Sequence, residues 1–75
     1  MTSPRDRSAG LTEGERRALE LSATGLDVTD VAEAMCSSPD TVRVWLASAC
    51  RKLGARSKLE AVLIAARRGD IDLTL

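Results

Sequence analysis

The fold of this chain is decided by residues 28–53, which read VTDVAEAMCSSPDTVRVWLASACRKL. A short Cys-Ser-Ser break, ending in Ser38-Pro39, divides two helix-forming segments. Serine is a favoured N-cap, and proline fits the first helical position because its missing amide has no partner there. We therefore predict helices over about 28–35 and about 39–53, joined by a turn of three to four residues. A helix-turn-helix unit requires a turn this short, although short helical hairpins also occur in plain bundles.

Capping residues predict one further helix on each side of this pair. The segment TEGE that begins at Thr12 is a capping box, in which a hydroxyl and a carboxylate accept from each other's backbone amides. It starts a helix over about 13–24, and the segment SKLE that begins at Ser57 starts another over about 58–68. A glycine follows the first, third and fourth helices, where it can adopt the left-handed conformation that ends a helix.

The composition supports an all-α domain. Apolar residues make up 44% of the 75 residues, but Trp45 is the only aromatic side chain. A core of Leu, Val, Ala, Ile and Met suits short packed helices better than a sheet. We predict one four-helix domain over 11–71, with a disordered arm at 1–10 and a short tail at 72–75. So small a domain has little room for a substrate cavity, which disfavours an enzyme and a small-molecule ligand.

Several other classes of protein are excluded by what the sequence lacks. It has no histidine, and its two cysteines do not have the spacing of a metal site, so we expect neither a metal nor a cofactor. No apolar run approaches about 18 residues, and the polar N-terminus has no signal-peptide core. We therefore expect a cytoplasmic protein with reduced thiols. Cys36 and Cys50 are interpreted as small buried hydrophobic residues, with a redox switch as the unsupported alternative.

The formal net charge is zero, but the charges are unevenly distributed. Residues 1–40 carry four basic and eight acidic side chains, a net charge of −4. Residues 41–75 carry seven basic and three acidic side chains, a net charge of +4. Such a domain can present a basic face to phosphates, although an accidental imbalance between solvated faces explains the numbers equally well.

The predicted helix over 39–53 has two different faces. Its inward stripe repeats at helical spacing and consists of Val42, Leu46, Ala49 and Leu53. Its outer row is basic and small and consists of Arg43, Ala47 and Arg51, with Val44 and Ser48 beside it. A guanidinium can bind a guanine edge, a valine can contact a thymine methyl, and Ser48, Arg51 and Lys52 can hold phosphates. The alternative is an ordinary solvated face that contains two arginines.

A set of short motifs occurs in a fixed order along nearly all of residues 11–71. The motifs are Leu11-Thr12 with Glu15, Gly25, Thr41-Val42-Arg43, Lys52-Leu53-Gly54 and Glu60-Ala61-Val62. In this combination the chain resembles the LuxR/GerE-type (LuxR/FixJ family) helix-turn-helix domain. Region four of sigma factors also carries a TVR helix-turn-helix, but the Lys-Leu-Gly motif followed by a capped fourth helix favours the LuxR type.

The resemblance implies a bacterial transcriptional regulator that binds double-stranded DNA as a homodimer, with the third helix as its recognition helix. The positions that match the family's base contacts are Arg43, Val44 and Ala47. Those that match its backbone contacts are Thr29, Ser38, Thr41 and Lys52.

Several positions depart from the family's pattern. Ala47 stands where a polar base-contacting residue is frequent, and Val28 replaces a commonly polar residue. The loss of polar contacts at these two positions predicts weaker direct readout of the bases. Ser37 and Ala49 replace larger aliphatic residues, which predicts a thinner core. Trp45 replaces a histidine, and its indole either fills the space left by Ala49 and by the lack of other aromatic residues, or contacts the sugar-phosphate backbone of DNA or a partner protein.

The predicted fourth helix has two apolar faces. The first, formed by Ala61, Val62 and Ala65, is expected to join the core. The second repeats at helical spacing and consists of Leu59, Leu63 and Ala66, which a monomer would expose. This stripe, and independently the family resemblance, predict a dimer contact there, unless the tail over residues 71–75 covers it.

The sequence is therefore compatible with two functions. The first is a DNA-binding transcriptional regulator, which Arg43, Arg51, Lys52 and the charge distribution favour. The second is a degenerate helix-turn-helix module that binds another protein, a partner regulator or a polymerase component, through Trp45 or the fourth helix. Val28 and Ala47 favour this second function.

Overall fold

Four α-helices make up the regular structure of residues 10–72, the part of the chain that the computed structural model describes. They are α1 (Glu13–Ala23), α2 (Val28–Ala34), α3 (Pro39–Leu53) and α4 (Lys58–Arg68). The predicted all-α class is confirmed, and the helix bounds agree with the expected ones to within one residue. The expected disordered arm and tail fall almost entirely outside the described residues.

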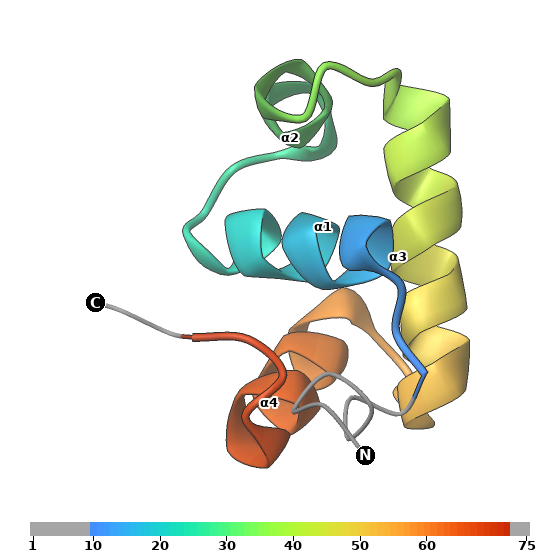
Figure 1. Ribbon diagram of the computed structural model, residues 1–75, viewed down its shortest axis with the longest axis vertical. Coiled ribbons are helices and arrows are strands. Elements are labelled where there is room, and N and C mark those ends of the chain that lie inside the picture. The colour runs from blue at the N-terminus through green and yellow to red at the C-terminus, as the bar shows by residue number, and fades with distance from the viewer. Residues whose placement is uncertain (1–9, 73–75) are drawn as a thin grey trace, which may run out of the picture.

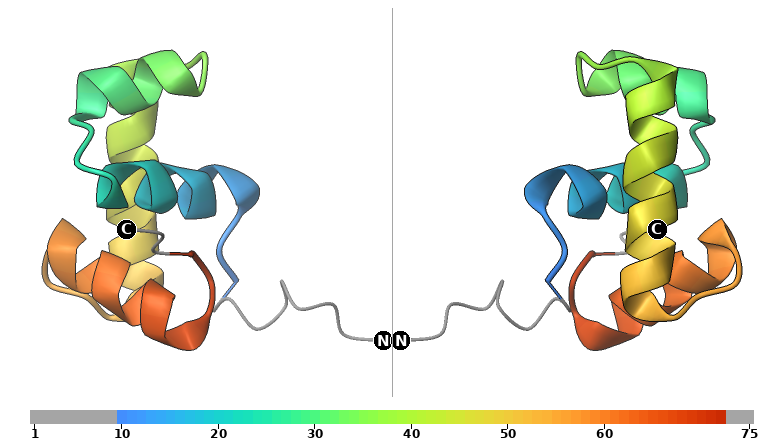
Figure 2. Two further views of the ribbon diagram at one scale, coloured as in Figure 1. Left: turned by 90° about the vertical axis from the view of Figure 1, so that its left-hand side faces the viewer. Right: turned by 90° about the vertical axis from the view of Figure 1, so that its right-hand side faces the viewer.

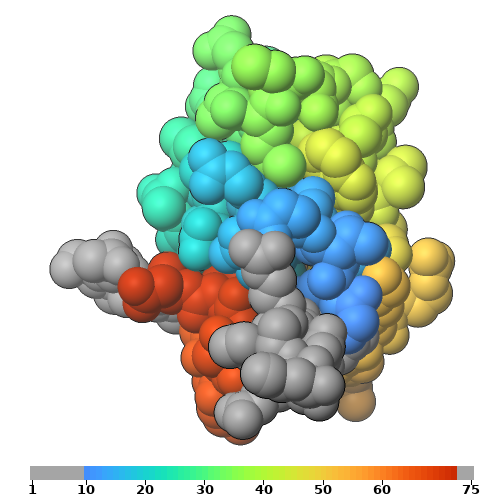
Figure 3. Space-filling model, in the orientation of Figure 1, coloured from blue at the N-terminus to red at the C-terminus, as the bar shows by residue number. Residues whose placement is uncertain are grey.

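The long helix α3 runs along one side of the molecule, and the other three helices pack against its inner side (Figure 1). α1 crosses the middle of α3, α2 lies beside its N-terminal half, and α4 lies beside its C-terminal half. α1 also contacts both α2 and α4, so the core forms where α1 and α3 cross. Side chains fill the spaces that separate the ribbons (Figure 3).

The predicted caps account for where the helices begin. At α1 the capping box is complete: the Glu15 amide donates to the Thr12 hydroxyl at 3.2 Å, and the Thr12 amide donates to Glu15 Oε1 at 2.8 Å. At α4 only half of the expected box is present. The Glu60 amide donates to Ser57 Oγ at 3.1 Å, but the Glu60 carboxylate accepts from the Arg56 amide at 2.7 Å instead of the Ser57 amide.

The core consists of aliphatic side chains from all four helices. Both predicted inward stripes are buried, the one on α3 and the one on α4. The other buried hydrophobic residues are Ala18, Leu19, Val31, Ala32 and Ile71. Ile71 is 6% exposed and belongs to this core, so it does not cover the second face of α4, where Leu59 and Leu63 are exposed. The last three residues of the tail that was expected to cover this face, 73–75, lie outside the described residues.

Trp45 packs against the first turn of α1, which supports its interpretation as a structural residue. Its ring lies so close to Gly14 that a Cβ there would stand 2.6 Å from Trp45 Cε2. No ordinary contact is that short, so the indole occupies the space that a side chain at residue 14 would need. Glycine at this position lets α1 and α3 approach each other closely.

The turn between α2 and α3 has the same pair of closing hydrogen bonds as the ends of α3 and α4, but a cysteine stands where those two helices have a left-handed glycine. The Ser37 amide donates to the Ala32 carbonyl at 2.8 Å and the Cys36 amide to the Glu33 carbonyl at 3.2 Å. These two bonds form a Schellman motif, which places Cys36 in the left-handed region at φ +55°. Cys36 is exposed, so the expectation of a buried thiol was wrong: its side chain leaves the core because the motif turns the chain outward.

Candidate nucleic-acid interface

The outer side of α3 is free of other helices. When the molecule is viewed from this side, α3 stands in front along its whole length, with α1, α2 and α4 behind it (Figure 2, right). The tight turn at Cys36 and the Ser38 cap fix where α3 starts relative to α2. The fold thus presents one uncovered helix in the arrangement that a helix-turn-helix unit uses to enter a groove.

The predicted outer row of α3 is solvent-accessible. Val44 is 65% exposed and the Arg43 side chain is 61% exposed. Ala47 and Arg51 are also exposed, whereas Ser48 is half-buried between the two faces. The structure therefore brings the predicted base-contacting residues and Arg51 together on one open surface.

Arg43 has a partner that the sequence analysis missed. Its Nη1 atom lies 2.9 Å from Asp40 Oδ1, one helical turn earlier, and the Asp40 side chain is 94% exposed. An exposed ion pair of this kind contributes little to stability, because both groups remain well hydrated. It nevertheless restricts the guanidinium to the surface that faces away from the core. The i,i+3 spacing of opposite charges was the available signal in the sequence.

The predicted backbone contacts at the start of α2 and α3 lie on exposed positions. Ser38 Oγ accepts from the Thr41 amide at 3.2 Å and lies 3.0 Å from Thr41 Oγ1. Both hydroxyls are exposed, as is Thr29 in the first turn of α2. Hydroxyls and amides at helix N-termini are suited to phosphate oxygens.

Lys52 differs from the other predicted phosphate contacts, because acceptors within the protein already hold its ammonium group. Lys52 Nζ lies 2.7 Å from Glu15 Oε1 and 3.0 Å from the carbonyl oxygen of Gly10. The Glu15 side chain is only 5% exposed, and that of Lys52 is 34% exposed. No local spacing in the sequence reports this contact, since its partners are 37 and 42 positions away.

The surroundings of Glu15 stabilise its charged form. Burial by itself raises the pKa of this carboxyl. Hydrogen bonds from Lys52, Ser48 and the Thr12 amide, together with the positive charge of Lys52, outweigh burial and lower its pKa to about 2. The Glu15 carboxylate is therefore charged at neutral pH, and its contact with Lys52 ties the first turn of α1 to the last turn of α3.

The second apolar face of α4 is exposed as predicted for two of its three residues. Leu59 is 68% exposed and Leu63 is 52% exposed. Ala66 is half-buried and packs against the core, so it contributes less to this surface than expected. Exposed leucines one helical turn apart form a small apolar patch that a partner could cover.

Of the remaining side chains between residues 10 and 72, the two free thiols and the possible metal ligands were the candidates for chemistry. The Cys50 thiol is half-buried and lies 3.6 Å from the Ser57 carbonyl oxygen; burial, and secondarily the charge of Glu60, raise its pKa. Within residues 10–72, no three metal-ligating side chains come together. None of the helices in that range is both long and apolar enough to cross a bilayer.

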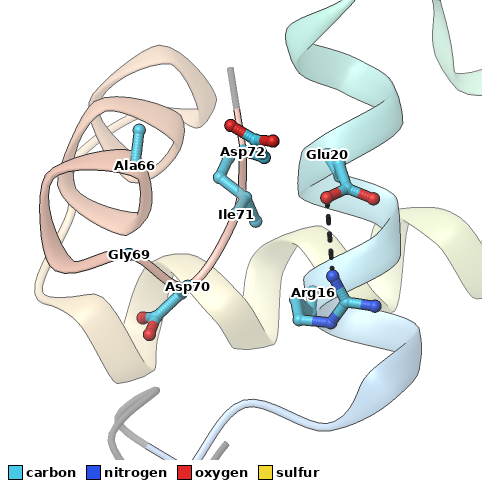
Figure 4. Close-up of a pocket in the computed structure, with 7 residues that line it drawn as sticks. All are labelled: Arg16, Glu20, Ala66, Gly69, Asp70, Ile71 and Asp72. Carbon is cyan, nitrogen blue, oxygen red and sulfur yellow. Dashed lines mark hydrogen bonds and ion pairs between the residues drawn. The ribbon is translucent and has the colours of Figure 1, made fainter. Parts of the chain in front are cut away.

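A shallow hollow of about 440 Å³ lies between α1 and the segment after α4 (Figure 4). Arg16 and Glu20, on one wall, pair with each other at 3.5 Å. The Asp70 carboxylate, which comes from the opposite wall, points away from them. Asp72 also lines the hollow, so three of its four charged side chains are acidic and one of those three, Asp70, points away from α1.

Comparison with known proteins agrees with this geometry. Residues 9–65 match the family model GerE, described as bacterial regulatory proteins, luxR family. A solved chain entitled "Structure of Transcription factor, GerE" superposes with a TM-score of 0.81 at 28% identity, covering 85% of this chain and 96% of that chain. No curated protein matches the sequence. The chain therefore belongs to the LuxR family of bacterial regulatory proteins, whose helix-turn-helix domain is a non-enzymatic DNA-binding module for regulating transcription.

Proposed function

We propose that this protein regulates transcription by placing α3 in the major groove of double-stranded DNA and that it does so as a dimer formed through α4. The observation that carries the proposal is the open outer row of α3, where Arg43, Val44, Ala47 and Arg51 lie exposed on one uncovered helix. A single α-helix fits the major groove, and small or basic side chains allow it to approach the base edges.

Arg43 is the strongest candidate for direct base readout. A guanidinium can donate two hydrogen bonds to a guanine, and the Asp40 carboxylate at 2.9 Å already restricts its orientation. Val44 offers a methyl surface for a thymine, and Ala47 makes room without offering a hydrogen bond. Direct readout of the base sequence is therefore weak, and much of the affinity comes from phosphate contacts. The residues that make these contacts are Thr29, Ser38, Thr41, Ser48 and Arg51.

Dimer formation would compensate for this weak direct readout. Two copies joined through the Leu59 and Leu63 surfaces would present two α3 helices to successive major grooves, so the half-sites would lie about one helical turn apart. The same exposed leucines favour the second candidate function, in which a protein partner covers α4 or contacts Trp45 and DNA binding is weak or absent.

A salt titration separates the two candidates. The wild type and the variants Arg51→Ala and Arg17→Ala are bound to a fluorescent duplex between about 50 and 200 mM salt. Each phosphate contact adds about 0.9 to the slope of log affinity against log salt, so we expect a steep wild-type slope that Arg51→Ala reduces by about 0.9. Arg17, on α1, is the matched control and should leave the slope unchanged. Absence of wild-type binding at low salt would support the protein-binding alternative.

A further inference from the structure

Lys52 occupies a position where the family resemblance implies a phosphate contact. Acceptors within the protein, however, already bind its ammonium group. Its ammonium group donates to Glu15 Oε1 at 2.7 Å and to the Gly10 carbonyl at 3.0 Å. Glu15 Oε1 also accepts from the Thr12 amide at 2.8 Å, so one nearly buried oxygen joins the start of α1 to the end of α3.

We infer that Lys52 is a positioning residue for α3 and makes no contact with a DNA phosphate. The inference rests on the proposed DNA-binding function and narrows it, because it removes one cation from the phosphate-binding set. It also assigns to Glu15, which lies on α1 away from the outer row, a role in orienting the recognition helix.

The cost of releasing Lys52 supports this assignment. If its ammonium group turned toward a phosphate, the Glu15 carboxylate, which is 5% exposed in the structure, would lose the cation that lies 2.7 Å from it. An uncompensated buried charge is far more costly than a lost surface contact. A DNA phosphate offers Lys52 one negative charge in water, which does not offset that loss.

The position of the pair within the fold explains how it would act on DNA binding. Among ion pairs between residues 10 and 72, the others join residues two to four positions apart, whereas this one joins α1 to α3. It lies in the last turn of α3, so it fixes the tilt of that helix across α1. The neighbouring Arg51 is exposed, and no described residue pairs with its guanidinium, which leaves it available for a phosphate.

The test compares Lys52→Met, Lys52→Arg, Arg51→Ala and the double variant Glu15→Gln/Lys52→Met with the wild type. Binding to a duplex is measured across the salt range, and the folded fraction of each variant is measured by circular dichroism. Arg51→Ala should reduce the salt slope by about 0.9. Lys52→Met should weaken the binding of folded protein about fivefold in parallel at every salt concentration, with an unchanged slope. Lys52→Arg should restore affinity.

The double variant keeps the test decisive if Lys52→Met does not fold. It removes both charges, so it should fold and show the wild-type salt slope. A slope reduced by about 0.9 in either Lys52→Met or the double variant overturns the inference and makes Lys52 a phosphate contact. Wild-type affinity in folded Lys52→Met also overturns it, because Lys52 would then affect stability alone. If the wild type does not bind DNA, the proposed function is wrong. That result is distinguishable from a change of salt slope in a variant, which bears on the role of Lys52 alone.

Discussion

Glu15 is the residue at which burial, charge and helix capping meet. Its pKa is about 2 in the folded protein, against 4.5 for an ordinary glutamate, because the hydrogen bonds and charge around it outweigh burial. A depressed folded pKa adds stability that is present above the unfolded value and is lost as the pH falls toward the folded value. The difference corresponds to about 3 kcal/mol, lost progressively between about pH 5 and pH 2.

This pH dependence can be assigned to Glu15 by one substitution. Glu15→Gln should be less stable than the wild type at pH 7, and the difference should shrink as the pH falls from about 5 to about 2, because the unfolded wild-type chain takes up a proton at Glu15 before the folded protein does. Urea denaturation of both proteins across this range measures it. Comparison of the two proteins isolates Glu15, because the substitution changes no other carboxylate. A stability difference that stays constant with pH would contradict the assignment.

Cys36 gives a second prediction at the scale of one residue. It holds a left-handed conformation at φ +55°, whereas α3 and α4 end in Gly54 and Gly69 in the same region. A residue with a Cβ is strained there, so Cys36→Gly should stabilise the protein by about 0.5–1 kcal/mol and raise its Tm. Gly54→Ala, the matched control at another left-handed helix end, should lower the Tm. A lower Tm for Cys36→Gly would show that the thiol makes a stabilising contact.

The packing of α1 on α3 depends on one close approach between the two helices. A Cβ at Gly14 would stand 2.6 Å from the Trp45 ring, so Gly14→Ala must displace the indole. We expect this substitution to destabilise the protein by about 1–3 kcal/mol, although alanine is the better helix former. Thermal denaturation and a red shift of tryptophan emission report the effect.

The same substitution in a Trp45→Ala background separates the clash from helix propensity. Without the indole, alanine at residue 14 meets no crowded ring and should stabilise α1 by up to about 1 kcal/mol. The change of sign between the two backgrounds is the expected result. Equal destabilisation in both would mean that the close approach of Gly14 and Trp45 does not limit the packing of α1 on α3.

The proposed assembly of the whole molecule depends on the exposed leucines of α4. Leu63→Asp places a charge on a surface that the dimer would bury, so it should give a monomer and weaken binding to a duplex with two half-sites. Sedimentation velocity measures the first effect. For sedimentation, Val44→Asp is the control and should leave the oligomeric state unchanged, since Val44 is also exposed but lies on α3, outside the proposed dimer surface. A sedimentation coefficient that Leu63→Asp leaves unchanged would contradict the proposed dimer.

The sequence by itself determined the helices and their inward stripes. Caps such as Thr12, Ser38 and Ser57 act within four residues, and apolar periodicity acts within one helix, so both are readable from local spacing. The outer row of α3 could also be predicted, since the residues of that helix that do not face the core must face solvent. The motifs of the LuxR family added the expectation that the third helix is the recognition helix.

Only the tertiary structure decided which distant groups meet. The contact of Lys52 with Glu15, the fit of Trp45 over Gly14 and the burial of Ile71 each depend on how α1, α3 and α4 cross. Such contacts join residues more than thirty positions apart along the chain or rest on a close approach of two helices, and no local spacing encodes either. The exposed surface of α3 was therefore predictable from the sequence, whereas the ion pair between Lys52 and Glu15 was not.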